Sequence, residues 1–132
     1  MIMIARNAIF LPLLLLGVTA ASPPAMPGVT RETLQSKDLP GTRLKTVMVR
    51  TVIARGSKVP PHTHPGLEVG YVLSGEATLT VRGQTPRALK AGDSFTTSEG
   101  TVHNLANRGA APLAVLSTYI VDPSRPILSP AP

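Results

Sequence analysis

Two of the three histidines in the chain, His62 and His64, are separated by a single residue, and Glu68 follows four residues after the second. Imidazole nitrogens and carboxylate oxygens bind divalent transition metals, and a set of two histidines and one carboxylate leaves coordination positions open for other ligands. Taken alone, the pattern has two interpretations: most of a metal site, or a surface histidine pair beside a proline-rich turn.

The residues around this pair indicate how the three side chains could meet. Residues two apart in a β-strand face the same side, so His62 and His64 would present both rings to one ion. The two prolines before His62 lack backbone N–H groups, so the chain enters this strand without full ladder pairing. The Pro65-Gly66 pair predicts a turn, after which Glu68 starts the next strand and can bring its carboxylate back to the same point.

The third histidine, His103, completes a spacing that resembles the two motifs of the cupin family. The first motif of that family is a glycine, five residues, HxH, three or four residues, a glutamate, six residues and a glycine. The second is a glycine, five residues, PxG, two residues, a histidine, three residues and an asparagine. The matching residues here are Gly56, His62, His64, Glu68 and Gly75, followed by Gly92, Gly100, His103 and Asn107, with Ser98 where proline is usual.

This resemblance implies an all-β fold, a double-stranded β-helix or jelly-roll barrel, whose mouth holds one divalent metal ion. It also implies that His62, His64, Glu68 and His103 are the ligands, and that Asn107 caps a turn without touching the metal. Iron, manganese, nickel, copper, cobalt and zinc all accept nitrogen and oxygen ligands, so the metal is not identified. Four protein ligands on a six-coordinate ion leave two positions for water, dioxygen or a small-molecule substrate.

The middle of the chain independently predicts short strands joined by turns. The stretch from Leu44 to Ala54 is rich in β-branched residues, and Val47, Val49, Thr51 and Ile53 share one face by the period of two. No segment has the period of a substantial helix, and short strands with glycine-rich turns are typical of a β-sandwich or barrel. The predicted strands cover residues 44–54, 67–74, 77–81, 87–90, 94–97, 101–106 and 112–121.

Both ends of the chain differ from this middle region. Residues 1–21 carry Arg6, a short apolar run and then small residues, the order of a secretory signal peptide, with an uncleaved anchor as the alternative. We therefore expect a periplasmic or secreted protein without stable membrane insertion after cleavage. Residues 22–29 predict a proline-rich linker, residues 30–122 the barrel domain, and residues 123–132 an irregular proline-rich tail.

Composition excludes several other chemistries. The chain of 132 residues has no cysteine, which rules out disulfides, thiolate metal sites and cysteine nucleophiles. Its formal net charge is +6, but no two basic residues are adjacent, and aromatic residues make up 3% of the chain. Because nucleic-acid binding needs a clustered basic patch or stacking rings, we expect a solvated basic surface and no nucleic-acid partner.

The strand that begins with Glu68 also suggests a partner. Val69, Tyr71 and Leu73 alternate with the inward residues and should form an apolar row on the outside. Such a row favours a homodimer, and cover by a terminal segment is the alternative. On the inward side, Gly70 either leaves room beside the ion or marks a bulge.

The site suggests two classes of function. The first is an exported, single-domain metalloenzyme acting on a small organic substrate, with dioxygenase-like oxidation preferred over the isomerase and decarboxylase reactions that also occur among cupins. The second is a non-catalytic module that binds a metal or a metabolite. The sequence shows no separate acid–base residue besides the predicted ligands, so it is compatible with both classes.

Overall fold

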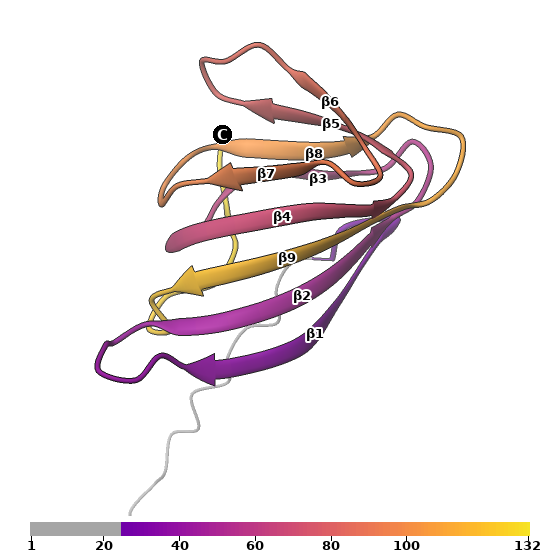
Figure 1. Ribbon diagram of the computed structural model, residues 1–132. Helices are drawn as coiled ribbons and strands as arrows, with labels where there is room; N and C mark the ends of the chain where they lie inside the picture. Colours follow the sequence, from indigo (N-terminus) through magenta and orange to yellow (C-terminus); the bar gives the residue numbers. More distant parts are fainter. Residues whose placement is uncertain (1–24) are drawn as a thin grey trace, which may run out of the picture.

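The computed structural model describes residues 25–132, so the predicted signal peptide and the first linker residues lie outside the described part of the chain. Within it, ten strands form two five-stranded antiparallel sheets, and no helix occurs (Figure 1). One sheet runs β1 (Val29–Asp38), β2 (Lys45–Ile53), β9 (Leu113–Val121), β4 (Gly66–Ser74) and β7 (Ser94–Thr97). The other runs β10 (Ser129–Pro130), β3 (Lys58–Thr63), β8 (His103–Asn107), β5 (Glu76–Val81) and β6 (Arg87–Lys90).

This arrangement confirms the predicted all-β jelly-roll class. Consecutive strands often belong to opposite sheets, so the neighbours within each sheet come from distant parts of the sequence. Side chains alternate between the inside and the outside along each strand, as the period of two requires. Along β4, for example, Glu68, Gly70 and Val72 are buried, whereas Val69 and Tyr71 between them are exposed.

The interior is apolar at one end of the barrel and polar at the other. The register of β4 and β9 shows this division, because Val72 lies opposite Val115 while Glu68 lies opposite Tyr119. The apolar end is a single buried cluster: Ile53, Val59, Val72, Ala77, Leu79, Leu89, Phe95, Leu105, Leu113 and Val115. Burial of these side chains provides the main driving force for folding, at roughly 25 cal/mol per Å² of apolar surface removed from water, and leaves the opposite end free for polar groups.

Two predicted turns depend on glycine. Gly56 and Gly75 have φ angles of 75° and 84°, in the left-handed region where side chains are strained. At Gly75 an added Cβ would also lie 2.7 Å from the backbone oxygen of Pro112. Both positions therefore require glycine for backbone reasons, as the sequence predicted for strand ends.

The first strand, β1, was not among the predicted strands. Its sequence, VTRETLQSKD, contains few apolar residues, and most of its side chains are exposed. It forms the edge of its sheet and pairs only with β2, with a register irregularity between Thr33 and Gln35. Pairing with a neighbouring strand, a tertiary feature, thus stabilises a segment that has no strong strand pattern of its own.

Residues 123–132, here called the C-terminal segment, lie against the barrel. Ser129 and Pro130 pair with β3, and the backbone N–H of Ala131 donates to the carbonyl oxygen of Pro61 at 3.0 Å. Ile127 and Leu128 pack against the buried apolar clusters. The segment is irregular except for its short pairing with β3, and it closes one side of the polar end of the interior.

The opposite end of the described chain also contacts the barrel. Met26, in the predicted linker, and Val29, which begins β1, pack against the core, and the Ala54 N–H donates to the Gly28 carbonyl oxygen at 2.7 Å. None of the described residues belongs to a helix that is long and apolar enough to cross a membrane.

Candidate metal centre

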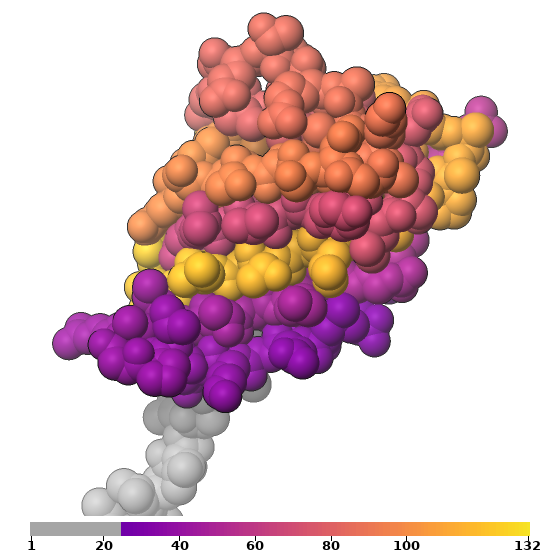
Figure 2. All heavy atoms as spheres, in the orientation of Figure 1, coloured from indigo at the N-terminus to yellow at the C-terminus, as the bar shows by residue number. Residues whose placement is uncertain are grey.

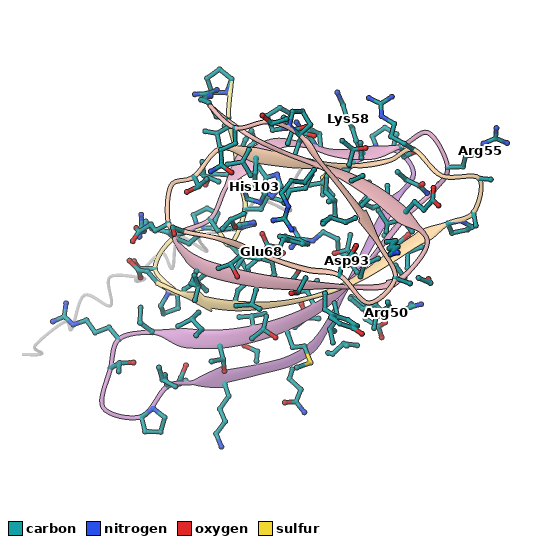
Figure 3. The ribbon with its side chains drawn as sticks, turned by 45° about the horizontal axis from the view of Figure 1, so that its top comes forward. Arg50, Arg55, Lys58, Glu68, Asp93 and His103 are labelled. Atoms are coloured by element: carbon teal, nitrogen blue, oxygen red, sulfur yellow. The ribbon has the colours of Figure 1, made fainter. Side chains whose placement is uncertain are left out.

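The structure brings the four predicted ligands together at the polar end of the interior. His62 in β3 lies opposite His103 in β8, Glu68 projects inward from β4 in the other sheet, and His64 lies just beyond the end of β3. All four residues are buried, with 3–5% of their surface exposed. Figure 3 shows Glu68 and His103 inside the barrel, whereas Arg55 and Lys58 project outward.

The nitrogen atoms of the three histidines lie within 4.8 Å of one another, and three distances among the four ligand atoms are close to 3 Å. The Nε2 atoms of His62 and His64 are 3.1 Å apart. The Oε2 atom of Glu68 lies 3.2 Å from Nε2 of His64 and 3.1 Å from Nε2 of His103. Two ligands bound about 2.1 Å from an ion at right angles would be about 3.0 Å apart, which is the spacing of neighbouring octahedral positions.

Each imidazole is oriented by a backbone carbonyl group. The Nδ1 atoms of His62, His64 and His103 lie 2.7, 2.5 and 2.9 Å from the carbonyl oxygens of Pro60, Ile127 and Thr101. Because a carbonyl oxygen only accepts, each Nδ1 carries a hydrogen, so in the neutral form of each ring Nε2 directs a lone pair toward the centre. The required tautomer is therefore set by three separate segments of the backbone.

Glu68 is held by two hydroxyl groups. Ser117 Oγ donates to Oε1 at 2.8 Å, and Thr97 Oγ1 donates to Oε2 at 3.1 Å. Burial opposes ionisation of this carboxyl, but hydrogen bonds from Nε2 of His103 and His64, which require a proton on those nitrogens, outweigh burial and hold the pKa of Glu68 well below its usual range. The carboxylate is therefore ionised, as a metal ligand must be.

His62, whose ring lies beside the rings of His64 and His103, is neutral. Burial, with the neighbouring His103, lowers the pKa of His62 to about 4. At neutral pH its Nε2 thus offers a lone pair instead of a proton, which is the form that binds a metal.

A cation fits this donor set. Three Nε2 atoms and one carboxylate oxygen direct lone pairs at one point, and they repel one another unless a proton or a metal ion lies between them. Protons would create buried imidazolium groups, which the lowered pKa of His62 disfavours. A single divalent ion would satisfy all four donors at once, and the three distances of 3.1–3.2 Å given above match neighbouring ligand positions.

Several residues of the site were not predicted from the sequence. Thr97, Ser117 and Tyr119 surround Glu68 or His64, and the Tyr119 ring lies 4.7 Å from the His64 ring, centroid to centroid. Burial, with the Glu68 charge, raises the pKa of the Tyr119 phenol well above its ordinary value. A signal was present: Ser117 and Tyr119 occupy inward positions of a strand whose other inward residues are apolar.

A small space, here called the inner cavity, adjoins the donor atoms. Its volume is about 30 Å³, enough for water-sized molecules but not for an organic substrate. His62, Glu68 and His103 form one wall, and apolar side chains, among them Phe95 and Leu105, form much of the rest.

Neither interpretation of Gly70 holds in the structure. An added Cβ at Gly70 would overlap the ring of Phe95, so this ring and not open space occupies the position beside the glycine. The register irregularity of β4 lies between Val72 and Ser74, which excludes a bulge at Gly70 in its pairing with β9.

Asn107 behaves as expected of a turn residue. Its Nδ2 donates to the carbonyl oxygens of Ile53 and Ala111, and its Oδ1 accepts from the Gly109 N–H. It lies away from the donor atoms and fixes the chain between β8 and β9.

Comparison with known proteins agrees with this geometry. A family model described as the cupin domain matches residues 49–119. Germin-like protein 1-1 from Oryza sativa subsp. japonica is 35% identical over 108 residues, which cover 73% of this chain and 46% of that protein. The chain therefore spans less than half of the length of this curated relative.

Solved structures share the fold. A conserved protein with a double-stranded β-helix domain from Klebsiella pneumoniae matches with a TM-score of 0.67 and 25% identity, covering 83% of this chain and 90% of that one. A recombinant oxalate oxidase in complex with glycolate matches with a TM-score of 0.62 and 25% identity, covering 78% of this chain and 55% of that one.

Proposed function

The chain belongs to the cupin family, and from this premise we propose that it binds one divalent metal ion through His62, His64, Glu68 and His103. The observation that carries the proposal is the convergence of three Nε2 lone pairs and one carboxylate oxygen in a buried site, with each Nδ1 hydrogen committed to a carbonyl group. Iron, manganese, nickel, copper, cobalt and zinc all suit these donors.

We further propose that the protein oxidises a small organic substrate with dioxygen. A bound metal would supply Lewis acidity and open positions for substrate oxygens and dioxygen. The chain itself contributes a rigid ionised Glu68, held by Ser117 and Thr97, and a Tyr119 phenol that stays protonated near the site. The similarity to an oxalate oxidase at 25% identity supports this reaction class without identifying the substrate.

One observation favours the alternative function, a non-catalytic module that binds a metal or a metabolite. The inner cavity of about 30 Å³ has no space for an organic molecule beside the ion. A reaction at the metal therefore requires that the substrate reach it from the adjoining surface.

Metal retention tests the site. Replacing His62 or His103 with Ala, or Glu68 with Gln, should lower the metal content of the purified protein at least about ten-fold, since the first two changes remove a donor atom and the third removes the negative charge of the site. Glu99→Gln is the matched control, because Glu99 is an exposed carboxylate outside the donor set. Elemental analysis gives the metal content and circular dichroism checks the β-fold; wild-type metal content in the three site variants would contradict the assignment.

Oxygen consumption then separates the two functions. The metal-loaded protein would be assayed with catechols, flavonols and β-dicarbonyl compounds in an oxygen electrode. Uptake that is lost in His103→Ala supports oxidation. Retained metal without turnover, combined with ligand-induced thermal stabilisation, supports the binding module.

We also propose that the protein is exported and acts outside the cytoplasm. The support is the charge, apolar run and small residues of positions 1–21. N-terminal sequencing of the protein recovered from the periplasm or the medium would test this, with a new N-terminus near residue 21 or 22 as the expected result; recovery of only the uncleaved chain in the membrane fraction would oppose it.

A further inference from the structure

Arg31 is a basic residue at the metal centre that neither the motifs nor the proposed ligands explain. It lies in β1 with its side chain half-buried, and its Nη2 donates to the Tyr119 phenol oxygen at 3.3 Å. Its guanidinium carbon is 6.0 Å from the centroid of the Tyr119 ring, whose other neighbour is His64. The Tyr119 ring therefore separates the positive charge of Arg31 from His64, a predicted metal ligand.

Two spaces meet at this side chain. Arg31 forms part of the wall of the inner cavity, together with Glu68 and His103. It also lines a second space, here called the outer hollow, of about 440 Å³ between the β1–β2 strands and the C-terminal segment. That volume is within the range of small-molecule sites, so a ligand lying in the outer hollow could extend past Arg31 toward the metal.

The charges of the outer hollow leave one positive group without a partner. Lys45 is 3.7 Å from Asp38, and Arg125 is paired with Glu99 and Asp122. Among residues 25–132, the Arg31 guanidinium forms no ion pair. A half-buried cation of this kind is matched by one negative charge from a ligand, and the planar guanidinium suits a carboxylate, which it can bind with two parallel hydrogen bonds.

One part of the wall of the outer hollow is apolar, and polar residues such as Thr33 and Ser36 complete it. Val47, Val49, Val121 and Ile127 line the outer hollow, and all four belong to the cluster that surrounds Tyr119. These side chains would contact the body of the ligand. The other charged residues of the outer hollow, Lys45, Asp122 and Arg125, are already paired, so a second charge on the ligand would find no free partner there.

From these contacts we propose that Arg31 determines specificity by binding the carboxylate of a small monocarboxylic acid whose apolar body lies in the outer hollow. The inference rests on the proposed function in one respect, which is that the reacting end of the bound acid would point toward the metal. The carboxylate site itself does not need the metal.

Matched acids and amides test the inference. Binding of salicylate and salicylamide, and of hexanoate and hexanamide, would be measured by titration calorimetry on the full-length wild type and on Arg31→Met, which removes the charge but keeps an unbranched side chain. The wild type should prefer each acid about ten-fold or more, the range of a hydrogen bond to a charged group. Arg31→Met should reduce this preference to less than about two-fold.

Arg50→Met is the control for net charge, because Arg50 is exposed on the other face of β2 and lies outside both spaces. It should keep the wild-type preference. The inference is overturned if the wild type binds neither acid, if it binds the amides as well as the acids, or if Arg31→Met discriminates like the wild type.

The metal content of the same samples keeps the two proposals apart. A protein that binds no metal but loses its acid preference in Arg31→Met refutes the metal site and supports the role of Arg31. A protein that retains metal in both forms without any acid preference refutes the role of Arg31 alone.

Discussion

At the scale of single residues, the site depends on side chains that hold the ligands as much as on the ligands themselves. The Nδ1 hydrogens of the three histidines are directed to backbone carbonyl groups, and Glu68 accepts hydrogen bonds from Ser117 and Thr97. Such contacts fix the tautomer and the orientation before an ion binds, which lowers the cost of ordering the site. A site of this kind also needs rigid packing of the core residues next to it.

Gly70 and Phe95 form part of this packing, and Phe95 also lines the inner cavity. The Gly70→Ala substitution should destabilise the fold by about 1–3 kcal/mol, because the new methyl group overlaps the Phe95 ring and the ring must move within a filled core. Urea unfolding monitored by circular dichroism measures the change.

A second substitution distinguishes this overlap from a general effect of alanine in a strand. Phe95→Leu supplies a smaller side chain at the same place, so Gly70→Ala should cost less in the Phe95→Leu background than in the wild type. Equal costs in the two backgrounds would show that the ring is not the cause.

At the scale of elements, the register of the strands decides which donors meet. His62 and His103 face each other across the β3–β8 pair, and Glu68, on β4 in the opposite sheet, lies 3.1 Å from Nε2 of His103. The C-terminal segment adds a contribution from outside these strands, since the Ile127 carbonyl is the acceptor for His64 and Leu128 lines the inner cavity.

Removing residues 127–132 should therefore weaken metal binding about 10–100-fold, the usual cost of losing a group that orients a ligand. Metal titration of the truncated protein against a competing chelator gives the affinity. Leu128→Ala is the matched control, because it removes apolar packing but leaves the Ile127 carbonyl in place; its stability should fall while its metal affinity stays near that of the wild type. An unchanged affinity in the truncated protein would show that this carbonyl is dispensable.

At the scale of the whole molecule, one face of the barrel is apolar and uncovered. Val69, Tyr71 and Leu73 are 44%, 46% and 43% exposed, so no described segment of the chain covers the row that was expected on the outside of β4. Figure 2 shows the face of the sheet in which β4 runs between β9 and β7. We propose a homodimer that buries this row, since a contiguous exposed apolar row is typical of an interaction surface.

Sedimentation equilibrium tests the dimer. The wild type should sediment as a dimer, and Tyr71→Lys should shift it toward the monomer, because a charge at the centre of the row would be buried without a partner. Thr78→Lys in β5, which belongs to the other sheet, adds the same charge elsewhere and should leave the dimer intact. A monomeric wild type, or a Tyr71→Lys protein that remains dimeric, would contradict the proposed interface.

The sequence alone predicted the fold class and most of the strands, and the four residues that it singled out as donors lie together in the structure. Their residue types and spacing are local properties: the period of two sets the direction of each side chain along a strand, and glycines with positive φ, such as Gly56, set where strands end. The polar strand β1 was not predicted, because its pairing with β2 and not its own pattern makes it a strand.

Only the tertiary structure decided what surrounds the donors. The acceptor for His64 is 63 residues away at Ile127, and the partner of Arg31 is 88 residues away at Tyr119. Contacts between such distant residues follow from the order of strands in two sheets and from the path of the C-terminal segment over them. No local pattern encodes these features, because many strand orders share the same alternation of apolar and polar residues.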